Sequence, residues 1–163
     1  MKTCRTIMLG AAVTLWLFCK SSAAVVPAMV GPNPFSPQNS SASGQLEVFS
    51  ALEGRSEGNN PSWHQHADYY LCDQQGRHLR HVDNTVGYYA QAPRVITLPP
   101  GKYLVKAPAK DALWLEVPVV IESGRITKVH LDGDWKLPAD TSETKFVDAP
   151  AGYPVGWRAG DAQ

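Results

Sequence analysis

The chain has 163 residues, and its 15 Lys and Arg balance its 15 Asp and Glu, so the formal net charge is zero. This length is sufficient for one domain with a hydrophobic core. The charges are well mixed and include no basic run, whereas a protein that neutralises nucleic-acid phosphates needs a cationic face. We therefore expect no nucleic-acid partner.

The first 24 residues predict a secretory signal peptide. Lys2 and Arg5 form a positively charged start, residues 7–18 form an apolar run, and the small residues at 21–24 suit cleavage near Ala23 or Ala24. The apolar run is too short to span a bilayer comfortably, and no second candidate follows it. We expect a periplasmic or secreted protein without a transmembrane segment after cleavage.

Cys19, at the end of the apolar run, leaves a lipid anchor open as the alternative. A lipidated Cys19 would become the new N-terminus and tie the protein to a membrane surface. The match to the bacterial lipobox is poor, because Phe18 stands where Gly or Ala is expected. Ordinary cleavage is the preferred hypothesis.

Cleavage after residue 24 changes both the charge and the cysteine content. It removes three of the 15 basic residues and none of the acidic ones, which leaves 12 basic and 15 acidic residues and a formal charge of −3. It also removes two of the three cysteines, so only Cys72 remains and no internal disulfide can form. The domain must then depend on its hydrophobic core alone.

Residues 25–44 contain four prolines and a Ser-rich end. Such a segment has little apolar surface to bury, and nothing in it has helical periodicity. We expect a flexible, extended tether.

Residues 45–133 favour about seven short strands, and no segment has a helical pattern. The strands are expected at residues 45–51, 66–73, 78–84, 94–98, 102–107, 113–122 and 125–132. The second and third form a hairpin, and Pro118 indicates an edge strand or a bulge in the sixth. This spacing predicts an all-β fold, a single Ig-like or prealbumin-like antiparallel β-sandwich.

The stretch "TLPPGKYLVKA" (97–107) contains a sharp corner, because Pro99 ends one strand and Gly101 lets the next begin in a new direction. Together with "VPVVIESGRITKVHLDG" (117–133), it resembles the carboxypeptidase regulatory-like and transthyretin-like bacterial β-sandwich domains, and "YYLCDQQGRHLR" (69–80) resembles their hairpin. The resemblance covers residues 45–133 and implies the sandwich fold. Its motifs are structural and imply no catalytic residue. In that family such domains are usually accessory, attached to enzymes, transporters or surface proteins.

Residues 134–163 form a C-terminal extension that is rich in Pro and Gly but also contains Trp135, Phe146, Tyr153 and Trp157. A fully disordered tail seldom has so many aromatic residues. We expect part of the extension to pack back on the sandwich or to cover an edge strand.

The sequence "SWHQHAD" contains a candidate zinc or copper site. His64, His66 and Asp68 are spaced i, i+2 and i+4, so an extended strand would point all three to one face, and His81 on a neighbouring strand would complete the set. Such short motifs also arise by chance, and the alternative is a row of solvated side chains. A small periplasmic metal-binding protein is therefore our second hypothesis.

Aromatic residues are more numerous than one small core needs. We predict a ligand-binding surface at Trp63, Tyr88 and Tyr89, because aromatic faces stack on sugar rings or anchor protein contacts. The alternative is that these side chains cap the ends of the sandwich.

The chain carries no motif that starts a catalytic site: it has no phosphate-binding glycine loop and no serine elbow, and Cys72 lacks the signature of a nucleophile. The sequence therefore predicts an exported, non-catalytic binding or assembly module of the bacterial envelope, without a cofactor. Its partner would be an envelope protein or a glycan, and a hydrolase is the third hypothesis.

Overall fold

The computed structural model describes residues 23–55, 63–86, 92–138 and 145–160. In these residues the protein is all-β, with thirteen strands and no α-helix. The predicted signal peptide lies almost entirely outside the described residues. No helix in the described ranges is long and apolar enough to cross a membrane.

The strands in chain order are β1 (Ala24–Val25), β2 (Val30–Gly31), β3 (Gly44–Phe49), β4 (Leu52–Arg55), β5 (Trp63–His66), β6 (Tyr69–Cys72), β7 (His78–Val82), β8 (Val95–Leu98), β9 (Gly101–Pro108), β10 (Trp114–Ile121), β11 (Ile126–His130), β12 (Phe146–Asp148) and β13 (Pro154–Arg158). A large sheet has the order β12-β13-β2-β10-β9-β6-β7, and β1 also pairs with β10. A small sheet has the order β11-β3-β8, and β4 and β5 form a separate ribbon.

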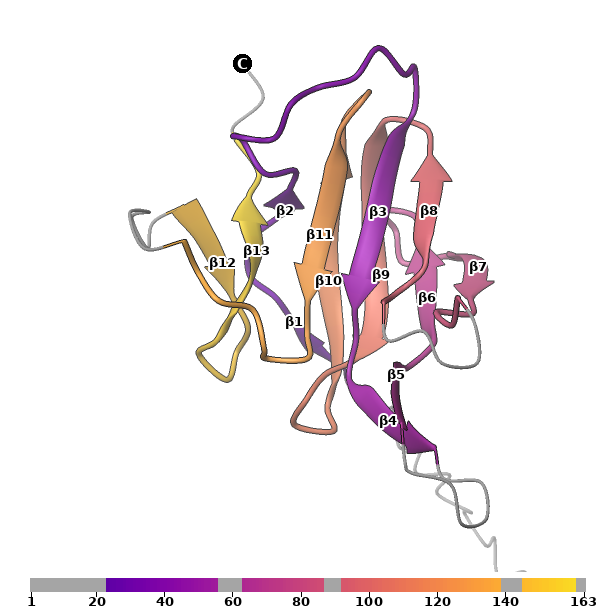
Figure 1. Cartoon of the computed structure of the whole chain (residues 1–163), viewed down its shortest axis with the longest axis vertical. Helices are drawn as coiled ribbons and strands as arrows, with labels where there is room; N and C mark the ends of the chain where they lie inside the picture. The colour runs from indigo at the N-terminus through magenta and orange to yellow at the C-terminus, as the bar shows by residue number, and fades with distance from the viewer. Residues whose placement is uncertain (1–22, 56–62, 87–91, 139–144, 161–163) are drawn as a thin grey trace, which may run out of the picture.

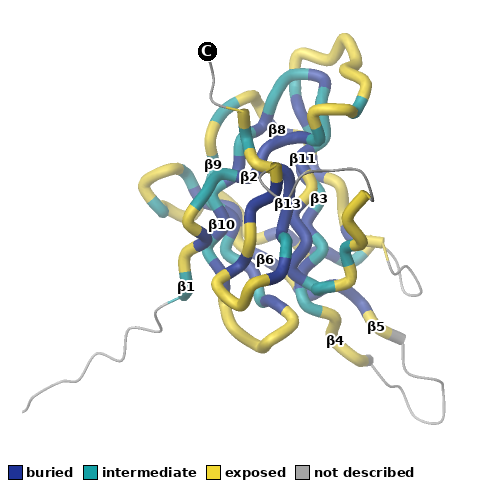
Figure 2. Tube along the Cα trace, turned by 90° about the vertical axis from the view of Figure 1, so that its left-hand side faces the viewer, coloured by how far each residue is buried: buried dark blue, intermediate teal, exposed yellow. Residues whose placement is uncertain are grey.

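The small sheet lies over the middle of the large one, so the fold has two layers (Figure 1). The buried positions line the strands between the layers, and the exposed ones lie mainly in the connecting loops (Figure 2). The core residues are mostly aliphatic, and the largest fully buried ones include Tyr69, Leu46, Leu71, Leu115, Ile121 and Leu131. Burial of this apolar surface is the main driving force for the fold.

Residues two apart along a strand share their burial in the central strands. Tyr69 and Leu71 are buried in β6, and Thr127 and Val129 are buried in β11. The hairpin over residues 66–84 is confirmed, since β6 and β7 pair antiparallel. In a strand, side chains alternate between faces, so one buried residue determines the position of its neighbours.

The predicted seven-stranded, antiparallel Ig-like arrangement is not confirmed. Both sheets are mixed, because β11 pairs parallel with β3 and β10 pairs parallel with β1 and β2. The additional strands lie in the N-terminal segment (β1, β2), largely between the first two predicted strands (β4, β5) and in the C-terminal extension (β12, β13).

Pro118 marks neither an edge strand nor a bulge in β10, because β10 has neighbours on both sides and its register with β9 is continuous. On one side Pro118 pairs with Leu104 in β9. On the other side β1 ends at the residue that pairs with Glu116, and β2 begins at Val30, which pairs with Val119. The missing N–H of Pro118 thus falls between two short strands.

The expected flexible tether over residues 25–44 is corrected by the structure. Val26 and Val30 are buried in the core, and the segment supplies Val25 of β1 and all of β2. An isolated bridge between Pro32 and Thr127 then joins this segment to the small sheet. The local composition did not predict this burial, because the strands that cover the valines are distant in the sequence.

The prediction that part of the C-terminal extension packs back is confirmed. β12 and β13 form a hairpin at the edge of the large sheet, and Phe146 and Trp157 are buried. β13 pairs with β2, with Trp157 opposite Gly31. The two segments outside the predicted sandwich therefore pair with each other.

We predict that Val30→Ala lowers the free energy of unfolding by about 2 kcal/mol, because the side chain is fully buried and truncation leaves a cavity. Val25→Ala is the control, since Val25 is 57% exposed, and it should cost less than about 0.5 kcal/mol. Urea unfolding measures both. Equal small effects would mean that residues 25–31 do not belong to the folded unit.

We predict that Gly124→Ala destabilises far more than Gly76→Ala. Both glycines have positive φ, 70° and 78°, so each substitution should cost about 1 kcal/mol in backbone strain. Only at Gly124 would the new Cβ overlap the backbone oxygen of Asn39, which should add about 2 kcal/mol. Thermal or urea unfolding measures the difference, and equal costs would contradict the close approach of these two segments.

Candidate functional site

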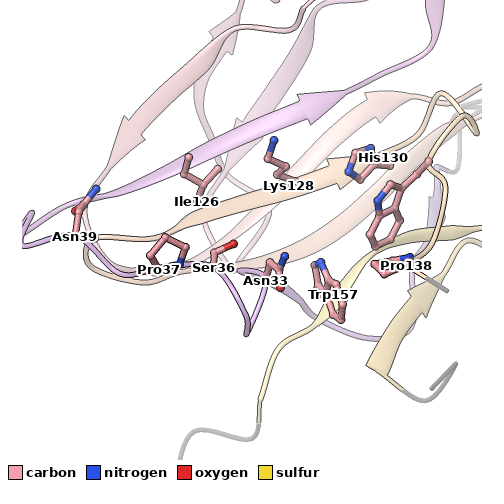
Figure 3. Close-up of a pocket in the computed structure, with 11 residues that line it drawn as sticks. Asn33, Ser36, Pro37, Asn39, Ile126, Lys128, His130, Pro138 and Trp157 are labelled. Atoms are coloured by element: carbon pink, nitrogen blue, oxygen red, sulfur yellow. The ribbon is translucent and has the colours of Figure 1, made fainter. Parts of the chain in front are cut away.

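A hollow of about 440 Å³ runs along the outer side of β11 and is here called the β11 groove (Figure 3). Lys128 and His130 of β11 lie on one side, and Asn33 and Ser36 of the segment after β2 lie on the other. The complete lining is Asn33, Ser36, Pro37, Asn39, Gly124, Ile126, Lys128, His130, Trp135, Pro138 and Trp157. Three distant parts of the sequence therefore build one concave surface.

Strand alternation in β11 places its groove-lining side chains. Thr127 and Val129 face the core, so Ile126, Lys128 and His130 face outward. Lys128 Nζ lies 2.8 Å from Glu47 Oε2 on the neighbouring strand β3. This ion pair holds the lysine stem along the sheet surface and offsets part of its charge.

His130 lies inside a stack of three rings. Its ring is 4.4 Å from that of Phe49 and 4.6 Å from that of Trp135, nearly parallel to both. Burial, together with the nearby charge of Lys128 and then of His66, lowers the pKa of His130 to about 4. The ring is therefore neutral near pH 7.

Trp157 and its neighbours close one end of the groove. The Trp157 ring contacts Phe146 at 4.7 Å and Phe35 at 5.6 Å, and Trp135 lies edge-on to Phe146 at 5.4 Å. Such edge-to-face and tilted contacts suit aromatic quadrupoles. Trp135 remains only half-buried, so part of its ring surface faces the groove.

The opposite side is a loop whose turns are stabilised by asparagine side chains. Asn33 Oδ1 accepts the N–H of Phe35 at 2.9 Å, and Asn39 Oδ1 accepts that of Ser41 at 3.0 Å. The backbone N–H of Asn39 donates to the carbonyl of Gly124 at 2.9 Å and attaches the loop to the start of β11. Since both Oδ1 atoms are engaged, each amide NH₂ is the polar end that remains to donate.

The chemistry of the described lining is rich in donors and contains no carboxylate. Amide NH₂ groups, the Ser36 hydroxyl, indole N–H groups and the Lys128 ammonium alternate with the apolar surfaces of Pro37, Ile126 and Pro138. This combination can hold a ligand that has apolar faces and many acceptor oxygens.

The structure divides the segment that carries His64, His66 and Asp68. The assumption of one continuous strand is wrong, because β5 ends at His66 and β6 begins at Tyr69. His64 is exposed, whereas His66 is buried with Nδ1 2.7 Å from the carbonyl oxygen of Ser50. His66 also packs its ring edge-on against Phe49 at 5.5 Å.

Asp68 does meet His81, as the sequence suggested. Asp68 Oδ2 lies 3.6 Å from His81 Nε2, and Asp68 Oδ1 accepts the backbone N–H of Asn84 at 3.0 Å. Within the described ranges, no three or more His, Cys, Asp or Glu side chains are grouped so that they could hold a metal ion.

The remaining predicted residues are only partly described. Tyr88, Tyr89 and the side chain of Trp63 lie outside the described residues, as does Cys19. Cys72 is described as a buried free cysteine, and burial raises the pKa of its thiol.

No protein-family model matches the chain, and the comparisons with curated proteins and with solved structures found no match either. The resemblance to the carboxypeptidase regulatory-like domains stays a prediction.

Sequence reasoning missed most of the β11 groove. The aromatic content of residues 134–163 indicated that Trp135 and Trp157 would be packed. It did not indicate which residues they would pack against. Nothing in the Pro- and Ser-rich segment marked Asn33, Ser36 or Asn39 as part of a site. Their position depends on the pairing of β2 with β10 and β13.

We predict that His130 makes stability depend on pH. The unfolded chain takes up a proton near the ordinary pKa of 6.5, whereas the folded protein does so only near 4. Between these values the unfolded state binds more protons, so stability falls as the pH decreases from 6.5 to 4, by about 3 kcal/mol in total from this group.

Urea unfolding at pH 7 and pH 4 tests this for the wild type, for His130→Phe and for His78→Phe. His130→Phe keeps a ring between Phe49 and Trp135 but removes the titration, so it should lose less stability on acidification than the other two. His78 is exposed and serves as the control. An unchanged pH dependence in His130→Phe would contradict the assignment.

Proposed function

We propose that this protein is an exported, non-catalytic binding module of the bacterial envelope and that its β11 groove binds a saccharide. The observation that carries the proposal is the lining of the groove, in which tryptophan rings at one end adjoin a row of hydrogen-bond donors without a carboxylate. Sugar rings present both C–H faces and oxygen acceptors, so they match such a surface.

The preference for a glycan over a protein partner rests on shape and polarity. A hollow of about 440 Å³ is in the range of small-ligand sites and is too small for a folded element. Because Lys128 is paired with Glu47, the groove has little net charge, which favours a neutral saccharide.

Export is supported by the pattern of residues 1–24, with lipidation of Cys19 as the alternative. The relation to the carboxypeptidase regulatory-like sandwiches remains part of the proposal, supported by the corner at residues 97–107. There β8 ends at Leu98 and β9 begins at Gly101, and Tyr103 Oη donates to the carbonyl of Pro99 at 3.0 Å.

We predict that the protein, expressed from its full chain, binds a neutral oligosaccharide from a panel of cell-wall fragments. Isothermal titration calorimetry gives the affinity, and a change in tryptophan fluorescence should accompany binding because Trp135 and Trp157 line the groove. Trp135→Ala should weaken binding by about tenfold, which corresponds to about 1.4 kcal/mol.

A second variant avoids removing packed aromatic surface. Ser36→Phe fills the groove and should abolish binding, whereas Ser40→Phe places the same side chain at an exposed position of the same segment and should leave binding unchanged. Binding that survives Ser36→Phe, or no binding to any member of the panel, would contradict the proposal.

A further inference from the structure

A second hollow, of about 260 Å³, lies at the outer surface of the large sheet and has a different chemistry. It is here called the acidic hollow, and its lining includes Glu53, Asp68, Tyr70, His81 and Trp114. It shares no lining residue with the β11 groove.

Two aromatic rings form one wall of the acidic hollow. Tyr70 of β6 and Trp114 of β10 are 40% and 43% exposed, and their rings stack at 5.9 Å with 28° between the planes. The buried neighbours Tyr69 and Leu115 fix these strands, so Tyr70 and Trp114 must point away from the core. A stacked aromatic pair left in solvent is a surface suited to ligand contact.

Two carboxylates, Asp68 and Glu53, line the hollow beside this wall, and a hydrogen bond holds Asp68 in place. Asp68 is positioned by the N–H of Asn84, whose own side-chain amide donates to Val48 O at 2.8 Å in β3. Asn84 is buried, so the support of Asp68 is rigid. Glu53 is exposed on β4 and makes no ion pair with any side chain that the structure describes.

Among the described lining residues, the base next to a carboxylate is His81, whose Nε2 lies 3.6 Å from Asp68 Oδ2. The described lining contains no Lys or Arg, and its only ionisable bases are His66 and His81. Lys106, which lies opposite Tyr70 in the sheet, is already paired with Glu116 at 2.7 Å. The hollow therefore combines two aromatic rings with two carboxylates, neither of which is paired with a Lys or Arg among the described residues.

We propose that the acidic hollow binds an organic cation, a primary ammonium or guanidinium group carried by a small molecule or by a peptide side chain. The ring faces of Tyr70 and Trp114 attract the cation through their quadrupoles, and Asp68 and Glu53 supply charge-assisted hydrogen bonds. The volume suits one such side chain and its alkyl stem. This inference does not depend on saccharide binding, because the two sites use different residues.

The full-chain protein is titrated with Nα-acetyl-lysine methylamide and with Nα-acetyl-arginine methylamide. Tryptophan fluorescence and calorimetry measure the binding. The neutral control is Nα-acetyl-norleucine methylamide, which keeps the alkyl stem but lacks the charge. We expect the cations to bind at least fivefold more tightly than the neutral control, and binding to weaken as salt is added. Equal binding of the norleucine derivative would overturn the proposal.

Variants assign the binding to the hollow. Asp68→Asn keeps the acceptor for Asn84 but removes the charge, and it should weaken cation binding at least fivefold. Asp148→Asn removes a carboxylate on the exposed side of β12 and should have no effect. Equal affinities in the two variants would overturn the assignment, as would binding of Zn²⁺ or Cu²⁺ with no binding of either cation.

A further titration with 1,5-diaminopentane distinguishes the source of the cation. Binding of this free amine with the affinity of the peptide derivatives supports a small-molecule amine, and binding of the peptide derivatives alone supports a peptide side chain. Both results support the shared chemistry. Failure of every amine would overturn it and leave the saccharide proposal untouched.

Discussion

The pairing of β2 between β10 and β13 is the contact on which the rest of the structure depends. Val30 is fully buried there, and Gly31 of β2 and Gly156 of β13 allow the close approach that this pairing needs. A Cβ on Gly31 would lie 2.8 Å from Ala159 Cα, and one on Gly156 would overlap the side chain of Val30. The two-residue strand β2 thus keeps the N-terminal and C-terminal segments of the described chain in one sheet.

The β11 groove is a direct consequence of this pairing. The segment that leaves β2 crosses to the small sheet at Pro32 and then forms one side of the groove. Trp157 lies opposite Gly31 and closes the end of the same groove. The candidate site is therefore located where the N-terminal and C-terminal segments meet the sandwich, and not on the sandwich loops.

The two hollows differ in charge, and a series of ring contacts connects their surroundings. His66 lines the acidic hollow and packs on Phe49, which stacks on His130, which in turn stacks on Trp135 in the β11 groove. The donor-rich groove favours acceptor oxygens, whereas the acidic hollow favours cations. Two ligands of different chemistry would therefore occupy separate places without competing for side chains.

The sequence predicted most of the central strands, such as β6 and β11, because alternation is a local property of an extended chain. It also indicated that the aromatic C-terminal extension would pack. The sequence did not predict that parts of residues 25–44 join the sheet, that β5 ends before Asp68, or that Asn33, His130 and Trp157 face one groove. These outcomes depend on pairings between residues far apart in the sequence, and local composition contains no information about them.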